Sequence, residues 1–261
     1  MAIQDIAAFV GAAAWLYPLS VLLKNCLTKP KIRLSPTDTI KMGYTALGPS
    51  MNLTCAIMTE KRDAIIERIE IEVKHKDGDS HAFIWKTLDE LQYEIRSFTG
   101  EGGTIGKSQP ATALKVNTTM LSEKTIGFQD VKYQEQFLVY GQKLAEFINH
   151  LRKINAPNFS DELFKSKEFT KLNDFYSNGM YWKEGNYTIQ LSLFITTATK
   201  PCIEFFTFSL ENKDVDSVKM NTTFLEQSMR ELIPAKEGEQ PPPKIIWNWI
   251  YPKLEKKKKS D

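Results

Sequence analysis

Apolar and polar positions alternate one by one over much of the first half of the chain. The apolar members of two such runs are Leu53, Cys55, Ile57, Ile69, Ile71 and Val73. A period of two is typical of strands that have one buried and one solvated face. The segment His75–Asp79 between two runs contains Asp-Gly, which favours a primed hairpin turn. The pattern therefore predicts antiparallel strands over residues 31–130, with a hairpin at 75–79.

The period becomes helical after Tyr133. Apolar residues then recur every three or four positions as far as Ile154, and Pro157 ends the pattern. Ser160 is a favourable cap for a second helix, which we expect to end near Ser177. The two helices form a predicted helical insertion at about 133–177.

Strand patterns return after this insertion. Residues 187–195 alternate again, and Ile203–Leu210 is apolar at nearly every position, as in strands buried on both faces. Residues 221–233 predict one more helix.

These elements predict a mainly β fold, an antiparallel sandwich that is immunoglobulin-like in broad architecture and carries the helical insertion, because the early hairpins need a second layer and the late strands need partners. Two separate domains are the alternative. The order Cys55, Trp85, Cys202 is also found in immunoglobulin domains, but the separations here are too long to indicate that family. We divide the chain into an anchor (1–24), a β domain (25–235) and a proline-rich linker with an aromatic, basic tail (236–261).

The anchor is predicted from the charge-free segment between Asp5 and Lys24. As a helix, Ile6–Leu23 would be about 27 Å long, close to the thickness of a bilayer core. It has no polar stripe, and the acidic start argues against a cleaved signal peptide. We expect a transmembrane helix marked by Ile6, Trp15, Leu23 and Lys24. The alternative is a helix packed in the core or against a partner.

Orientation follows from the basic residues, which all come after the span near its end. We expect the N-terminus outside and the domain in the cytoplasm, where thiols stay reduced. The spacing of Ala7 and Gly11 would allow a partner helix to approach closely. A luminal or extracellular glycoprotein is an alternative, because N-x-S/T triplets begin at Asn52, Asn117, Asn158, Asn186 and Asn221.

Composition excludes several classes of protein. Lys and Arg number 34 against 32 Asp and Glu, a net charge of +2, which gives no reason to expect nucleic acid as a partner. Three cysteines and three histidines are too few for a disulfide scaffold or a Cys/His zinc cluster.

Two motifs could carry chemistry. The run Gly100–Ser108 ends like a phosphate-binding loop, but Glu101 occupies the position of its first glycine and Pro110 follows, so we interpret it as a glycine-rich surface loop. His75 and His81 flank two aspartates, yet a hairpin tip would spread these ligands apart. We therefore assign no catalytic, cofactor-binding or metal-binding residue.

The tail combines tryptophans with lysines. Tryptophan favours the headgroup layer of a membrane, and lysines favour anionic lipid. The candidates for lipid contact are Trp247, Trp249, Lys256, Lys257, Lys258 and Lys259. Residues 245–251 also alternate as an edge strand would, and we favour the strand there and lipid contact for the lysines.

The sequence thus predicts a single-pass membrane protein whose cytoplasmic β domain is a binding or assembly module with a protein partner. An enzyme, either a hydrolase or nucleotide-dependent, is the alternative. A pocket with convergent titratable groups would favour the enzyme, and an exposed apolar or edge-strand patch would favour the module.

Overall fold

The computed structural model describes residues 15–21, 23, 29–96, 102–119, 121–196, 198–232 and 246–257. Its strands are β1 (Lys31–Pro36), β2 (Lys41–Thr45), β3 (Gly48–Glu60), β4 (Ala64–His75), β5 (Ser80–Arg96), β6 (Gly102–Pro110), β7 (Leu114–Val116), β8 (Ser122–Asp130), β9 (Gly185–Ile195), β10 (Cys202–Leu210), β11 (Trp249–Ile250) and β12 (Glu255–Lys256). Its helices are α2 (Val131–Lys153), α3 (Phe159–Phe164), α4 (Lys167–Asn178) and α5 (Asn212–Leu232).

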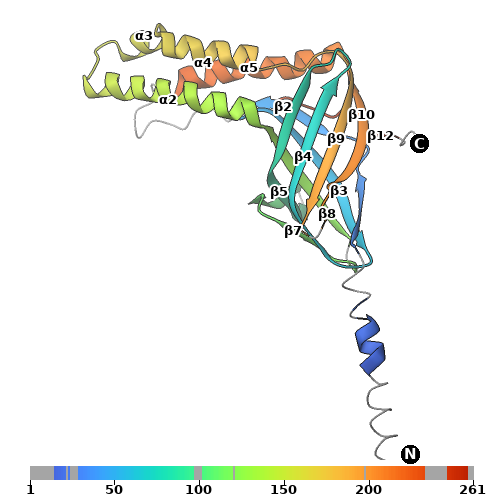
Figure 1. Ribbon diagram of the computed structural model, residues 1–261. Helices are drawn as coiled ribbons and strands as arrows, with labels where there is room; N and C mark the ends of the chain where they lie inside the picture. Colours follow the sequence, from blue (N-terminus) through green and yellow to red (C-terminus); the bar gives the residue numbers. More distant parts are fainter. Residues whose placement is uncertain are drawn as a thin grey trace, which may run out of the picture.

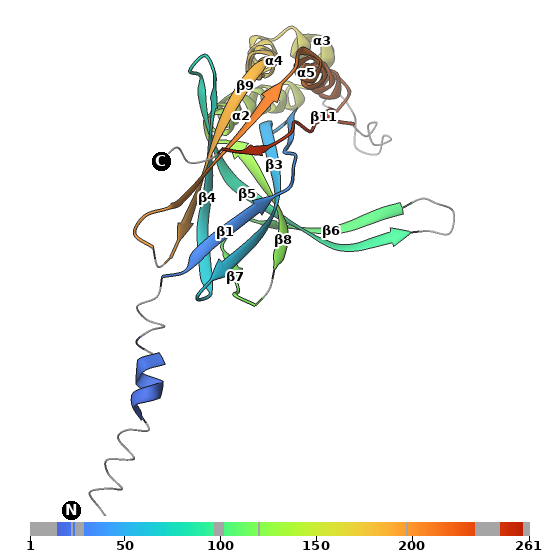
Figure 2. The same ribbon diagram turned by 90° about the vertical axis from the view of Figure 1, so that its right-hand side faces the viewer.

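The strands form one antiparallel sheet in the order β11-β2-β3-β8-β5-β4-β9-β10-β12. β1 pairs with residues 55–60 of β3, whereas β2 pairs with residues 48–52 of the same strand. β7 pairs with the start of β4, and β6 pairs with residues 87–96 of β5. The sheet curls strongly (Figure 1), and the β5–β6 hairpin projects from it (Figure 2). The mainly β prediction is confirmed. The expected two-sheet sandwich is replaced by one sheet whose long, twisted strands curl around their own buried face.

Strand alternation places the core on the inner face of the curl. Along β3, Met51, Leu53, Cys55 and Ile57 are buried, whereas Asn52, Thr54, Ala56 and Met58 between and after them are partly exposed. β4 and β9 repeat the pattern. Cys55 is a free thiol whose pKa is raised by burial to about 12, so it remains protonated.

The predicted hairpin is confirmed, because Lys74 pairs with Ser80 at the end of the β4–β5 ladder. Its turn is not of type I′, the primed type that Asp-Gly favours, because that type needs a positive φ at both central residues. Only Gly78 in this turn has one, at 102°, and its N–H donates to the His75 carbonyl at 3.0 Å. This geometry is that of a three-residue loop with a left-handed glycine.

The helices lie together at one end of the sheet (Figure 1). The helix expected from Ser160 to Ser177 is divided into α3 and α4, because the Ser166 hydroxyl accepts a hydrogen bond from the Phe169 N–H (3.1 Å) and starts a new helix. α5 begins at Asn212, well before the expected Asn221, since Asp214 accepts from the Glu211 N–H at its start.

Two further expectations are corrected. The glycine-rich run was expected as a surface loop, but residues 102–108 belong to β6 and pair with β5. Strand β10 was expected to be buried on both faces, yet only Phe206, Phe208 and Leu210 are buried. Toward its end β10 thus alternates between buried and more exposed residues, as a strand of an antiparallel sheet does when one face packs on the core.

The last described residues, 247–257, form a segment that we call the C-terminal strap. Trp249 pairs with Gly43 on β2, and Lys253 forms a bridge with Thr39. A few residues later, Lys256 pairs with Phe206 on β10. β2 and β10 lie next to the two ends of the strand order, so the strap pairs with part of each edge of the sheet. Unpaired edge strands invite association with other chains, and the strap blocks part of both edges with one segment.

Asn221 of α5 fastens the strap. Its side chain is fully buried (0% exposed), and its Nδ2 donates to the carbonyls of Tyr44 on β2 and Asn248 in the strap, both at 2.9 Å. The Asn248 N–H donates in return to Asn221 Oδ1 at 2.9 Å. One amide therefore joins helix, edge strand and strap.

The predicted anchor is described only at residues 15–21 and 23, which are helical. Its large apolar side chains are 39–77% exposed: Trp15, Leu16, Tyr17, Leu19, Val21 and Leu23. Figures 1 and 2 show this blue helix apart from the sheet. Ile6 and Lys24 lie outside the described residues. Among the residues that are described, no helix has the length and apolar character needed to cross a membrane.

Asn221→Asp tests the fastening of the strap. A carboxylate cannot donate to the Tyr44 and Asn248 carbonyls and would face both of them while buried. We expect the free energy of unfolding at pH 7 to fall by about 2–5 kcal/mol in urea titrations. The matched control is Asn158→Asp, an exposed site without a side-chain cap bond, which should change it by less than about 0.5 kcal/mol. Equal effects at the two sites would contradict the role of Asn221.

Candidate functional site

Asp130 lies where the sheet meets the helices, as the last residue of β8 and the N-cap of α2. Its side chain accepts from the Tyr133 N–H (2.9 Å) and the Tyr181 hydroxyl (2.8 Å), and His81 Nδ1 lies 3.6 Å away. The residue is 3% exposed. Burial opposes its charge, but the hydrogen bonds from His81, Tyr133 and Tyr181 outweigh it and hold the pKa below the ordinary value.

His81 comes from β5 and stacks flat on Tyr181, with ring centroids 3.4 Å apart and planes 5° apart. Burial first, and the Asp130 charge second, raise the pKa of Tyr181 well above its usual value, so the phenol stays neutral and donates. The three side chains form a compact His–Asp–Tyr cluster. About 29% of the His81 side chain remains exposed.

The cluster lines a pocket of about 390 Å³, which we call the His81 pocket. The sheet contributes its floor and the helices its walls. The lining residues are Ser80, His81, Ala82, Asp130, Lys132, Tyr133, Gln136, Phe175, Asn178, Gly179 and Tyr181. The volume is in the range of small-ligand sites.

The pocket has an oriented imidazole but lacks other parts of a hydrolytic site. A His–Asp pair supports a general base only where a nucleophile or water is held next to it. The lining serine, Ser80, instead donates its hydroxyl to Glu72 Oε1 at 2.7 Å. No cysteine or second carboxylate is among the described lining residues.

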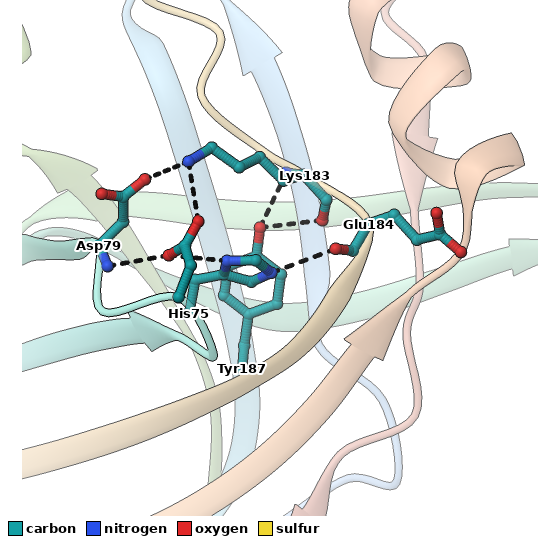
Figure 3. A network of polar contacts seen from close by, with 6 residues as sticks. His75, Asp79, Lys183, Glu184 and Tyr187 are labelled. Carbon is teal, nitrogen blue, oxygen red and sulfur yellow. Dashed lines mark hydrogen bonds and ion pairs between the residues drawn. The ribbon is translucent and has the colours of Figure 1, made fainter.

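The other histidine of the hairpin takes part in a separate network (Figure 3). His75 Nδ1 lies 2.9 Å from Asp77 Oδ1, and its Nε2 lies 3.1 Å from the Glu184 carbonyl. Lys183 Nζ contacts the carboxylates of both Asp77 and Asp79, which raise its pKa to about 12. The network ties the hairpin turn to the segment before β9.

This network bears on the metal site considered from the sequence. His75 lies beside Asp77, whereas His81 lies beside Asp130. The ammonium group of Lys183 contacts the carboxylates of Asp77 and Asp79. Within the described ranges, no group of three potential ligands forms a metal site.

The tail residues named as lipid contacts have partners in the sheet. A Cβ on Gly43 would lie 2.6 Å from the Trp249 ring, so the indole lies directly on the β2 backbone, and Lys41 Nζ is 4.3 Å from the ring centroid. Lys256 forms an ion pair with Glu204 (2.8 Å), and the Lys257 N–H donates to the Phe205 carbonyl. Lys258 and Lys259 lie outside the described residues. Lipid contact by this tail stays a prediction.

Sequence reasoning did not find the cluster. One signal was available, since Asp130 is a favourable N-cap directly before the helical pattern. Tyr181 follows the end of α4 without a motif, and its contact with His81 depends on how the helices pack on the sheet.

Comparison with known proteins gives no guide to the site: no family model, no curated protein and no solved structure matches the chain.

Asp130→Asn tests whether the cluster stabilises the fold through its charge. Asn is an equally good N-cap, so the start of α2 is kept while the ionised acceptor is lost. We expect unfolding at pH 7 to require about 1–3 kcal/mol less free energy. Because the folded pKa of Asp130 is lowered, its contribution is complete above the unfolded pKa of about 3.9 and is lost as the pH falls through the folded value. The difference between variant and wild type should therefore shrink toward pH 3 in urea titrations, and a constant difference would contradict this.

Proposed function

We propose that the chain is a binding module held at a membrane by residues 6–23, with its N-terminus outside and its β domain in the cytoplasm, and that it acts through a protein partner. The observation that carries the proposal is the exposure of the apolar side chains in the helical residues 15–21 and 23. Apolar surface left in water costs about 25 cal/mol per Å², so such a helix needs lipid or another helix around it. Packing in the core, the alternative considered from the sequence, leaves no such exposure.

The end of the sheet at which β1 begins supports a particular orientation of the domain relative to the membrane. Lys31, where β1 begins, pairs with Glu60, the last residue of β3, whereas the helices lie at the other end of the sheet (Figure 1). β3 has 13 residues and at about 3.3 Å per residue spans about 40 Å. An anchor before β1 therefore leaves the helices and the His81 pocket directed away from the bilayer, where a partner protein can reach them.

The same geometry separates the strap from the anchor. Trp249 pairs at Gly43, and Gly43 pairs with Ser50, about 33 Å along β3 from Glu60. The proposal accordingly assigns the anchor to the N-terminal segment, and lipid contact by the tail stays a separate prediction.

The His81–Asp130 pair is the observation that favours a hydrolase as the second candidate function. The direction of the Ser80 hydroxyl away from His81 favours the binding role.

Charged substitutions in the helix test the anchor. Lysine at Leu16 and Leu19 should release the protein from the membrane fraction, because each charge costs about 2.5–3.5 kcal/mol within a span. The matched control is Leu138→Lys on α2, a leucine that is 68% exposed, against 67% for Leu16 and 52% for Leu19; this variant should stay in the membrane fraction. Deletion of residues 1–24 should give a soluble protein with an unchanged thermal transition. The measurement is cell fractionation followed by thermal unfolding.

Two outcomes would contradict the proposal. Loss of the thermal transition on deletion would place the helix in the core. Sugar on the exposed Asn158 or Asn186 would place the domain in a lumen and overturn the orientation. Asn221 is uninformative here, because its amide is buried and engaged in hydrogen bonds.

A further inference from the structure

A hollow of about 340 Å³ lies on the outer face of the sheet beside the two strap tryptophans. We call it the tryptophan groove. The turn between β2 and β3 forms one side and the strap the other. Its lining residues are Thr45, Ala46, Leu47, Ser50, Asn52, Thr87, Gly127, Phe128, Gln129, Trp247 and Trp249. It shares no lining residue with the His81 pocket.

The floor consists of two cross-strand rows. Asn52 on β3 lies opposite Gly127 on β8, which lies opposite Thr87 on β5. In the next row, Ser50 lies opposite Gln129. These polar residues alternate with the buried core residues of the same strands, so they occupy the outer face by the period of the strands.

Ser50 has an unusual environment for a serine. It is 8% exposed, and its hydroxyl has no hydrogen-bond partner among the described residues. A buried hydroxyl without a partner costs about 1–3 kcal/mol, and most such groups in native proteins have one. An unpartnered hydroxyl in the wall of a groove indicates that a ligand supplies the missing partner.

Gly127 keeps the floor open. A Cβ there would lie 2.2 Å from Thr87 Oγ1 and 3.4 Å from Asn52 Oδ1. Any side chain at this position would displace these groups and fill the space between them. Because Gly127 has no side chain, the Thr87 hydroxyl and the Asn52 amide lie close to each other above the β8 backbone.

The lining chemistry restricts the ligand. Hydroxyl and amide side chains both donate and accept hydrogen bonds, and the tryptophans provide flat apolar surfaces. No carboxylate, ammonium or guanidinium group is among the described lining residues. The Lys41 ammonium lies over the ring of the lining residue Trp249. A phosphate-bearing ligand would have no paired charge here. A run of prolines would offer carbonyl acceptors only and would leave the accepting oxygens of the groove without donors. A sugar ring offers an apolar C–H face for an indole, together with hydroxyls that donate and accept.

We propose that the tryptophan groove binds a neutral saccharide, with a sugar ring against Trp247 and its hydroxyls bonded to Asn52, Thr87 and Gln129. The buried Ser50 hydroxyl, which lines the groove without a partner, joins them after a side-chain adjustment of the kind common on binding. The volume suits one or two sugar rings, at the lower end of small-ligand sites. The inference goes beyond the proposed function and does not depend on the anchor or on the His81 pocket.

Calorimetric titration of the full chain, in micelles of a detergent without sugar headgroups, tests this. The probes are glucose, galactose, N-acetylglucosamine and a linear trimer of each. We expect at least one to bind, and Asn52→Ala to weaken it about three- to tenfold, as for loss of one neutral hydrogen bond. The matched control is Asn186→Ala, an exposed asparagine on β9 outside the groove, which should leave affinity unchanged.

Ser50→Ala separates binding from stability. Removing a hydroxyl that has no partner should leave the thermal midpoint unchanged or raised, while weakening saccharide binding. Ser192→Ala, at a serine of equal exposure (8%) on β9, should leave binding unchanged. Binding by none of the six saccharides would overturn the proposal, as would equal effects of Asn52→Ala and Asn186→Ala. Binding of adenosine or a proline hexapeptide that depends on Asn52, in place of a saccharide, would also overturn it.

Discussion

The edges of the curled sheet determine much of the rest of the molecule. A sheet that curls without closing leaves two open edges, and here one short C-terminal strap pairs with β2 at one edge and with β10 at the other. Asn221 ties the strap to α5 and β2 through buried hydrogen bonds. Because the strap also carries Trp247 and Trp249, the segment that closes the sheet also forms a wall of the tryptophan groove.

Strand β8 connects the core with both pockets. Its inward residues, Ile126 and Phe128, are buried in the core, and its outward residues, Gly127 and Gln129, lie in the floor of the tryptophan groove. Asp130 ends the strand, caps α2 and orients His81. Because side chains of β8 alternate between its two faces, residues 126–130 contribute to the core, to the tryptophan groove and to the start of α2.

Local patterns in the sequence predicted the β4–β5 hairpin, the inner faces of β3, β4 and β9, and a helical region after β8. They did not predict how distant strands join, so a sandwich was expected where one curled sheet exists. Alternation at residues 245–251 favoured a strand, and β11 is there, but nothing local indicated that the strap also reaches β10. Asn221 was noticed as a glycosylation triplet, since its buried role depends on contacts with Tyr44 and Asn248. No local sequence pattern singled out Ser50 or Gly127, because the role of each depends on residues of neighbouring strands.

Hydrogen exchange on a chain that lacks residues 248–261 tests the closure of the sheet most directly. Amide exchange should accelerate in both β2 and β10, which lie at opposite ends of the strand order, while the central strands β4 and β5 remain protected. Unchanged protection in β10, with loss confined to β2 or absent from both strands, would show that the strap does not close the sheet.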